Sequence, residues 1–259
     1  MTASLQIVGT ICRRTWQKTA RRPVVLTFSF LQPILWILLF GFLFHRYDVG
    51  QADRGVRYLD FLVPGVCAMT VLFGASQSGI GLIRDMQTGF LSRMLRTPAD
   101  PALVLTGKIL ADVLRLQAQA FLILLIGWIL GAKLQFSPAA VVAILLALGM
   151  FAVSLSSVSC LIALKTGAQE SMAAFVHLVN MPLLFTSTAL APSRQMPDWL
   201  ASIARFNPLT LAVDAGRDAL LFGEFTLLPR ALGWLLLLAI VLFAAAGAAM
   251  RKYGRQTNQ

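Results

Sequence analysis

Apolar residues in this chain form long runs that are separated by shorter polar stretches. Each run has roughly 20 residues, the length with which an α-helix crosses the hydrocarbon core of a bilayer. The pattern therefore predicts an all-α integral membrane protein with one transmembrane domain over residues 1–259. The six predicted transmembrane helices cover residues 23–44, 59–83, 106–130, 138–164, 171–191 and 229–250.

The segment before the first run, residues 1–22, mixes apolar and basic residues. Apolar residues such as Ile7 and Ile11 alternate with basic residues such as Arg14 and Lys18 at approximately helical spacing. This pattern is typical of an amphipathic helix that lies in the inner membrane interface.

A second polar segment, residues 84–98, separates the second and third predicted spans. Its apolar residues recur at the spacing of one helix face, and Pro98 and Pro101 are expected to end that helix. They are Phe90, Leu91, Met94 and Leu95. The sequence leaves two interpretations open: a helix that rests on lipid, or a contact for a cytoplasmic motor protein.

The third polar segment, residues 192–228, precedes the last span on the outer side. A narrow apolar stripe is followed by Asn207-Pro208, which interrupts the chain before a second short helical pattern. The stripe consists of Trp199, Leu200, Ile203 and Phe206. We expect a bent helical pair that dips into the outer leaflet without crossing it, either as a cap or as a gate over a substrate path.

Composition and charge strengthen the membrane assignment. Only 13% of the residues are charged and 58% are hydrophobic, whereas soluble domains have about 25% charged residues. Most of the Lys and Arg residues that give the net charge of +11 fall on the side of the N-terminus. This bias predicts cytoplasmic termini in a bacterial inner membrane. Topology and anionic lipid head groups explain the basic charge, so we expect no nucleic-acid partner.

The residue pattern argues against catalysis by this chain. Cys12, Cys67 and Cys160 lack a C-x-x-C spacing, and His45 and His177 lie on different spans. We therefore expect no metal site, no catalytic site and no cofactor held by this chain.

One glycine pair has the spacing of a phosphate-binding loop. Gly74 and Gly79 lie inside an apolar span, however, and the Lys and Ser/Thr that such a loop requires do not follow them. Close helix packing is the better interpretation. An ATP-driven function would therefore need a separate ATPase subunit.

Polar residues within the spans are few. Lys108, Asp112 and Arg115 share one face of the third span, where mutual pairing would avoid the cost of a lone charge in hydrocarbon; an ion relay is the alternative. A further set of polar residues could line a substrate path or hold helices together. This set is Gln77, Ser78, Asn180, Thr186, Ser187 and Thr188.

Several short motifs, taken in order, resemble those of a known family. They are Tyr58-Leu-Asp-Phe-Leu-Val-Pro-Gly65, Arg84-Asp85, Gly89, Thr97-Pro98, Gly107-Lys108, Asn207-Pro-Leu-Thr210, Asp214 and Arg217. With the basic start and the six spans, the chain resembles a type-2 ABC exporter permease, the group that includes daunorubicin-resistance and nodulation-factor export subunits. The family usually has Glu soon after the glycine at position 89, where this chain has Phe90-Leu-Ser-Arg93.

The resemblance implies partners and residue roles. Two permeases would pair above two cytoplasmic ATPase subunits, which would bind the ATP and Mg. The segment that docks on the ATPase would include Arg84, Asp85, Gly89, Arg93, Arg96 and Pro98. The outer gate would be formed by Trp199, Asn207, Pro208, Thr210, Asp214 and Arg217.

The expected function is export of an amphiphilic small molecule, a drug or a lipid-like substrate. A polysaccharide or lipo-oligosaccharide exporter is the alternative within the family. Outside the family, the alternatives are an ion-coupled secondary transporter, a channel or a structural membrane subunit.

Overall fold

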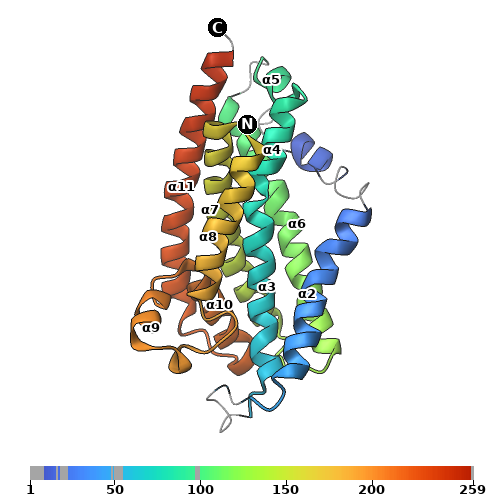
Figure 1. Ribbon diagram of the computed structural model, residues 1–259, viewed down its shortest axis with the longest axis vertical. Coiled ribbons are helices and arrows are strands. Elements are labelled where there is room, and N and C mark those ends of the chain that lie inside the picture. Colours follow the sequence, from blue (N-terminus) through green and yellow to red (C-terminus); the bar gives the residue numbers. More distant parts are fainter. Residues whose placement is uncertain are drawn as a thin grey trace.

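Long helices run side by side along the longest axis of the molecule (Figure 1). The computed structural model describes residues 9–15, 17, 23–47, 49, 55–96 and 100–257, and every regular element within these residues is helical. A helical segment at residues 9–15 precedes the numbered helices. These are α2 (Pro23–Leu43), α3 (Tyr58–Ser76), α4 (Ser78–Gln87), α5 (Phe90–Leu95), α6 (Pro101–Ile129), α7 (Pro138–Thr166), α8 (Gln169–Phe185), α9 (Asp198–Ala204), α10 (Pro208–Arg217) and α11 (Leu228–Thr257), with a 3₁₀ turn at Ser193–Gln195 and a π-helical turn at Asp218–Phe222.

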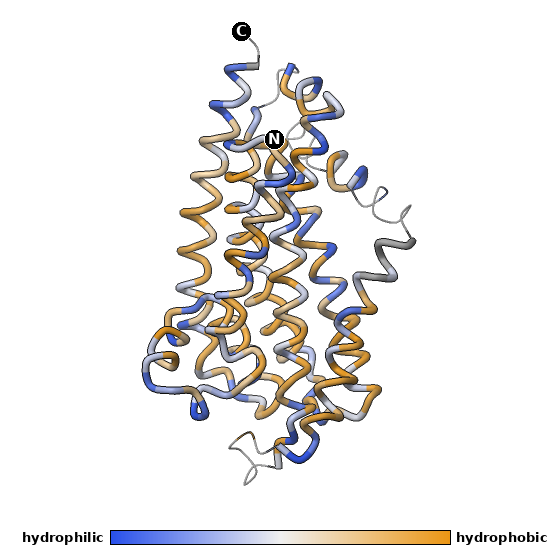
Figure 2. The backbone as a smooth tube through the Cα atoms, viewed as in Figure 1, coloured by the Kyte–Doolittle hydropathy of each residue, from blue (hydrophilic) through white to orange (hydrophobic). Residues whose placement is uncertain are grey.

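Four helical stretches of the described chain are long and apolar enough to cross a membrane. They are Tyr58–Gln87, which joins α3 and α4, and then Pro101–Ile129, Pro138–Thr166 and Leu228–Gln256. A shorter apolar stretch, Ser29–Leu43, lies in α2. Apolar residues fill the middle of the molecule and polar residues gather toward its two ends (Figure 2).

The helix ends differ from the ends of the hydrophobic runs. The predicted fifth span was expected to reach residue 191, but α8 ends at Phe185 because the following residues turn and bond to α10. In contrast, α4 continues to Gln87 and α11 to Thr257, beyond the predicted ends of their spans. Hydropathy marks where lipid contact ends, whereas backbone hydrogen bonding can continue a helix into water.

Three helices begin with the same two-residue motif, an N-cap residue followed by proline. The side chains of Asp100, Ser137 and Asn207 accept hydrogen bonds from backbone N–H groups of the first turn, at 3.0, 3.2 and 2.8 Å. Each cap is followed by a proline at the first helical position. Proline has no N–H to lose there, and its fixed φ suits the helix start.

Helix α7 forms the centre of the bundle and contacts α3, α4, α6, α10 and α11. Small residues allow this close packing: a Cβ at Gly216 of α10 would lie 2.5 Å from a side-chain carbon of Ile144 in α7. The α4–α5 turn and the last residues of α11 lie at one end of the molecule, here called the α5 end. Helices α9 and α10 lie toward the opposite end, the α9 end (Figure 1).

Candidate functional site

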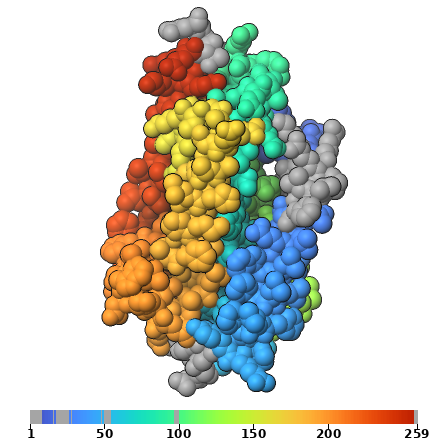
Figure 3. All heavy atoms as spheres, viewed as in Figure 1, coloured from blue at the N-terminus to red at the C-terminus, as the bar shows by residue number. Residues whose placement is uncertain are grey.

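A groove of about 850 Å³ opens between α2, the continuous α3–α4 pair and α6. Figure 3 shows the hollow beside α4, with α6 in green behind it. Its walls combine apolar side chains such as Trp36, Met69 and Phe73 with the polar side chains of Gln32 and Gln77. The groove extends from the polar α5 end, where Arg84 and Arg93 border it, to apolar residues of α2 and α3, so it can hold a molecule with both polar and apolar parts.

The groove exists because α2 diverges from α6. Pro33 lies inside α2 and has no backbone N–H, so the carbonyl of Ser29 lacks its usual helical donor. The side-chain amide of Gln119 in α6 donates to this carbonyl at 2.7 Å. From this bridge toward its first residues, α2 leans away from α6 (Figure 1).

The charged side chains of the groove carry an excess of positive charge. The basic ones are Arg14, Arg84, Arg93, Lys108 and Arg115, and the acidic ones are Asp85 and Asp112. Both carboxylates lie in ion pairs, Asp85 with Arg14 at 3.5 Å and Asp112 with Lys108 at 3.1 Å.

The Lys108–Asp112 pair is buried between α4, α6 and α7. The two residues are 8% and 7% exposed, and the Ser78 hydroxyl also donates to the Asp112 carboxylate. The predicted pairing within the third span is therefore confirmed for these two residues. It does not extend to Arg115, which has no ion pair within the part of the chain that the structure describes.

A serine from α7 interrupts the helix that runs along the groove. The Ser159 hydroxyl accepts a hydrogen bond from the Gly79 N–H at 2.8 Å and donates to the Ser76 carbonyl at 2.6 Å. In a regular helix the Gly79 N–H and the Ser76 carbonyl would each bond within the helix, but here both bond to Ser159. Helix α3 therefore ends and α4 begins at Gln77. A Cβ at Gly79 would lie 2.5 Å from the Ser159 carbonyl, so the interpretation of this glycine as a close-packing residue is confirmed.

The α5 end carries the residues predicted to dock on an ATPase. Gly89 has φ +66° and turns the chain from α4 into α5. Arg84, Arg93 and Arg96 are exposed, and Pro98 lies outside the described residues. Asp85, by contrast, is held within the molecule by its ion pair with the N-terminal segment.

The N-terminal segment packs on protein in its described part. Ile11 is 5% exposed and contacts Gly107 of α6, where a Cβ would lie 3.0 Å from the Ile11 side chain. The Arg14 guanidinium lies 3.2 Å from the ring centre of Phe90, the first residue of the stretch Phe90-Leu-Ser-Arg93 where the family usually has Glu. Part of the described stretch 9–15 therefore packs on protein, and the interfacial helix over residues 1–22 stays a prediction; Lys18 lies outside the described residues.

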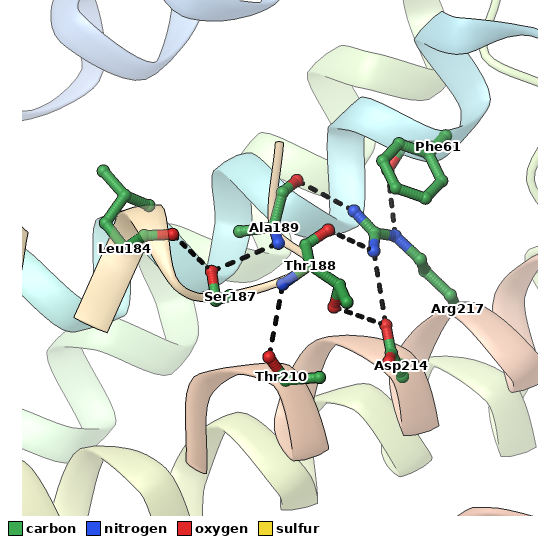
Figure 4. A network of polar contacts seen from close by, with 8 residues as sticks. All are labelled: Phe61, Leu184, Ser187, Thr188, Ala189, Thr210, Asp214 and Arg217. Atoms are coloured by element: carbon green, nitrogen blue, oxygen red, sulfur yellow. Dashed lines mark hydrogen bonds and ion pairs between the residues drawn. The ribbon is translucent and has the colours of Figure 1, made fainter. Parts of the chain in front are cut away.

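At the α9 end, one arginine joins three segments of the chain (Figure 4). The Arg217 guanidinium donates to the carbonyls of Phe61, Thr188 and Ala189 at 3.1, 2.7 and 2.8 Å, and pairs with Asp214 at 3.3 Å. It also stacks over the Phe61 ring at 3.5 Å. Because Arg217 is only 6% exposed, it acts as a clamp between α10, the start of α3 and the turn after α8.

The neighbouring predicted gate residues extend this clamp. The Thr188 N–H donates to the Thr210 hydroxyl at 3.2 Å, and the Asn207 amide donates to the Leu183 carbonyl and to the Thr186 hydroxyl at 2.7 and 2.9 Å. Pro208 begins α10. Trp199 of α9 has no place in the network and is 66% exposed.

The six residues predicted to line a path are separated by the structure. Gln77 borders the groove, and Thr188 borders a smaller cleft of about 200 Å³ beside the clamp. Ser78 and Asn180 make buried hydrogen bonds between helices, to Asp112 and Ser76. The hydroxyls of Thr186 and Ser187 donate to the carbonyls of Pro182 and Leu184 at the end of α8.

Two contacts beside the groove, those of Gln119 and Ser159, were not expected from the sequence. Pro33 in one span and the glutamines of another were the available signal for the Gln119 contact, but pairing them requires knowledge of which spans are neighbours. Among the described residues, no three His, Cys, Asp or Glu side chains gather as metal ligands would.

Comparison with known proteins decides the family. The family model described as "ABC-2 type transporter" matches residues 6–221. The chain belongs to this family. A "Putative transport permease ycf38" of Cyanophora paradoxa is 33% identical over 212 residues, which are 81% of this chain and 72% of the relative.

Two further relatives of the ABC-2 chain are named for resistance and multidrug transport. A "Daunorubicin resistance ABC transporter permease protein DrrB1" of Streptomyces coeruleorubidus is 29% identical over 76% of this chain and 68% of the relative. A "Probable multidrug ABC transporter permease YbhR" of Escherichia coli K12 is 23% identical over 61% of this chain and 42% of the relative. The ABC-2 chain is thus a multi-pass, membrane-embedded permease of an ABC transporter, a class that works with an ATPase partner.

Proposed function

We propose that this ABC-2 permease moves an amphiphilic small molecule, either a drug or a lipid-like compound, out of the cytoplasm. The observation that carries the proposal is the groove of about 850 Å³, which is lined by both apolar side chains and charged groups. The relatives named for daunorubicin resistance and multidrug transport support a small amphiphile.

The transporter is proposed to consist of two copies of this chain and two cytoplasmic ATPase subunits, which supply ATP and Mg. Each copy has six spans, formed by α2, α3–α4, α6, α7, α8 and α11, in a bacterial inner membrane with cytoplasmic termini. Helix α8, at 17 residues, is about 26 Å long, and α2 has 21 residues. Both lengths are compatible with a crossing near the lower limit.

The α4–α5 turn is the proposed contact with the ATPase. Its arginines at 84, 93 and 96 are exposed at the α5 end, and α5 is continuous through Gly89 with α4, which borders the groove. A displacement of α5 would therefore pass along α4 toward the break at Gln77. The Arg14–Asp85 pair keeps the N-terminal segment attached to this unit.

The α9 end is the proposed outer gate, with α9 and α10 as re-entrant helices. The Arg217 clamp holds this end closed, and its Asp214 partner borders the small cleft. If the gate opens, the three carbonyls bound by Arg217 lose their donor and need other hydrogen-bond donors. Because this loss costs free energy, the closed gate is the resting state.

A vesicle assay tests this function. The chain would be purified with its cognate ATPase, reconstituted in inside-out orientation, and supplied with ATP, Mg and a fluorescent amphiphilic dye. We expect ATP-dependent accumulation of dye in the lumen, and none with an ATPase variant that cannot hydrolyse ATP.

Two outcomes would refute the proposal. Transport of a glycan but of no dye or lipid would favour the polysaccharide exporter, and dye movement driven by an ion gradient without ATP would favour a secondary transporter.

A further inference from the structure

The groove contains a cation that no described carboxylate neutralises. Lys108, Asp112, Arg115 and Gln119 fall on one face of α6, and all four side chains border the groove. Asp112 already binds Lys108 and the Ser78 hydroxyl. The negative charge of Asp112 therefore neutralises Lys108. Arg115 borders the groove without a carboxylate partner among the described residues.

The position of Arg115 along its helix makes this lack of a partner costly. It lies nine residues after residue 106, where the predicted third span begins, which corresponds to about 14 Å along the helix axis. A lone cation at such depth costs a few kcal/mol or more. An anion that enters the groove would remove this cost.

Two further arginines, Arg84 and Arg93, border the groove nearer the α5 end. They also have no ion pair within the described part of the chain. Guanidinium groups suit phosphate because their planar donors can bind two oxygens at once. The groove therefore offers a series of phosphate-binding groups that leads inward to Arg115.

The rest of the wall suits an apolar tail. Trp36 of α2, with Met69 and Phe73 of α3, lines the same groove. Helix α2 leans away from α6 on this side (Figure 1), and a hollow is visible beside α4 (Figure 3). A lipid of the surrounding leaflet can enter sideways with its chains against these residues.

We infer that the groove binds an anionic membrane amphiphile with a phosphate head group, which Arg115 holds and which the apolar wall accommodates by its chains. The head group is the counterion of Arg115. That this amphiphile is also the transported molecule rests on the proposed export function; its binding does not.

A competition experiment on the purified chain tests the binding. The protein in detergent would receive equal amounts of phosphatidylglycerol and phosphatidylcholine, and retained lipid would be counted by native mass spectrometry. Wild type is expected to prefer phosphatidylglycerol. Arg115→Gln is expected to reduce this preference by about 10-fold, the size of one charge-assisted contact, whereas Arg115→Lys retains most of it.

Arg230→Gln provides the matched control, because Arg230 is an exposed arginine at the start of α11, away from the groove. It is expected to leave the preference unchanged. If Arg115→Gln fails to fold, Gln77→Glu serves instead: this exposed groove position tolerates the change, and the added negative charge is expected to weaken phosphatidylglycerol retention.

Three results would overturn the inference. The first is equal retention of the two lipids by wild type, and the second is an unchanged preference in both groove variants. The third is displacement of the lipid by excess glycerol phosphate, which would mean that the groove recognises the phosphate alone.

The export proposal and the groove proposal can fail separately. Selective lipid binding without ATP-dependent dye transport would refute the export function only, and dye transport without lipid preference would refute the groove assignment only.

Discussion

Replacing Arg217 by alanine tests whether one side chain holds the α9 end together. The change removes hydrogen bonds to three carbonyls, at 2.7 to 3.1 Å, and leaves the Asp214 carboxylate without its cation. Each buried carbonyl left without a donor costs about 1–3 kcal/mol, so the loss of the three together is expected to cost several kcal/mol. Since domains of this size lose about 2–4 °C of Tm per kcal/mol, we expect Tm to fall by roughly 10 °C in detergent.

The substitution Arg217→Lys separates charge from geometry. Lysine preserves the ion pair with Asp214, but its single ammonium group cannot reach three carbonyls on two segments at once. It should therefore recover only part of the lost stability. Arg205→Ala, at an exposed position of the same end, is the control and should leave Tm unchanged. A Tm of Arg217→Ala within about 2 °C of wild type would show that the clamp contributes little, against the burial argument.

Three further predictions concern the break in the groove helix and the α5 end. Ser159→Ala leaves two backbone groups without partners and should cost about 1–3 kcal/mol, measured by denaturant titration; an unchanged midpoint would contradict the bridging role. Arg93→Glu with Arg96→Glu should lower transport or weaken ATPase binding, measured by the vesicle assay and by co-purification, and intact values for both would exclude this contact. The Arg251 guanidinium donates to Asp100 and lowers the pKa of that carboxyl. The pair thus stabilises the fold above the ordinary Asp pKa, and this stabilisation is lost as pH falls through the lowered value. The Tm difference between wild type and Asp100→Asn should be small, because both side chains are exposed, and it should vanish in acid; a difference that grew on acidification would refute the sign.

Some features of the fold depend on local physics alone: the pairing of Lys108 with Asp112 was predicted, whereas the cap-proline pairs were not singled out as helix starts. The cap-proline pairs that begin at Asp100, Ser137 and Asn207 mark helix starts because their bonds join residues two or three positions apart. Lys108 and Asp112 pair because they are four residues apart on one helix. Such contacts need only the helical repeat to be predicted.

Contacts between distant segments could not be anticipated in the same way. Arg217 was selected from a motif, but its carbonyl partners lie 28 to 156 residues away along the chain. Asp85 was assigned to the ATPase contact, and its partner proved to be Arg14 of the N-terminal segment. Backbone carbonyls have no sequence signature, so no residue pattern reveals which of them will need a donor.

The sequence by itself determined that this chain is a helical membrane protein, because the thickness of the bilayer sets the length of the apolar runs that can cross it as helices. Only the tertiary structure decided where the groove lies. It is lined by α2, α3–α4 and α6, which meet where Gln119 of α6 bonds the Ser29 carbonyl of α2 and where Ser159 of α7 bonds across the α3–α4 break. Each of these contacts joins segments that are far apart in the chain. The packing of the helices determines such contacts, and no sequence pattern within one helix predicts them.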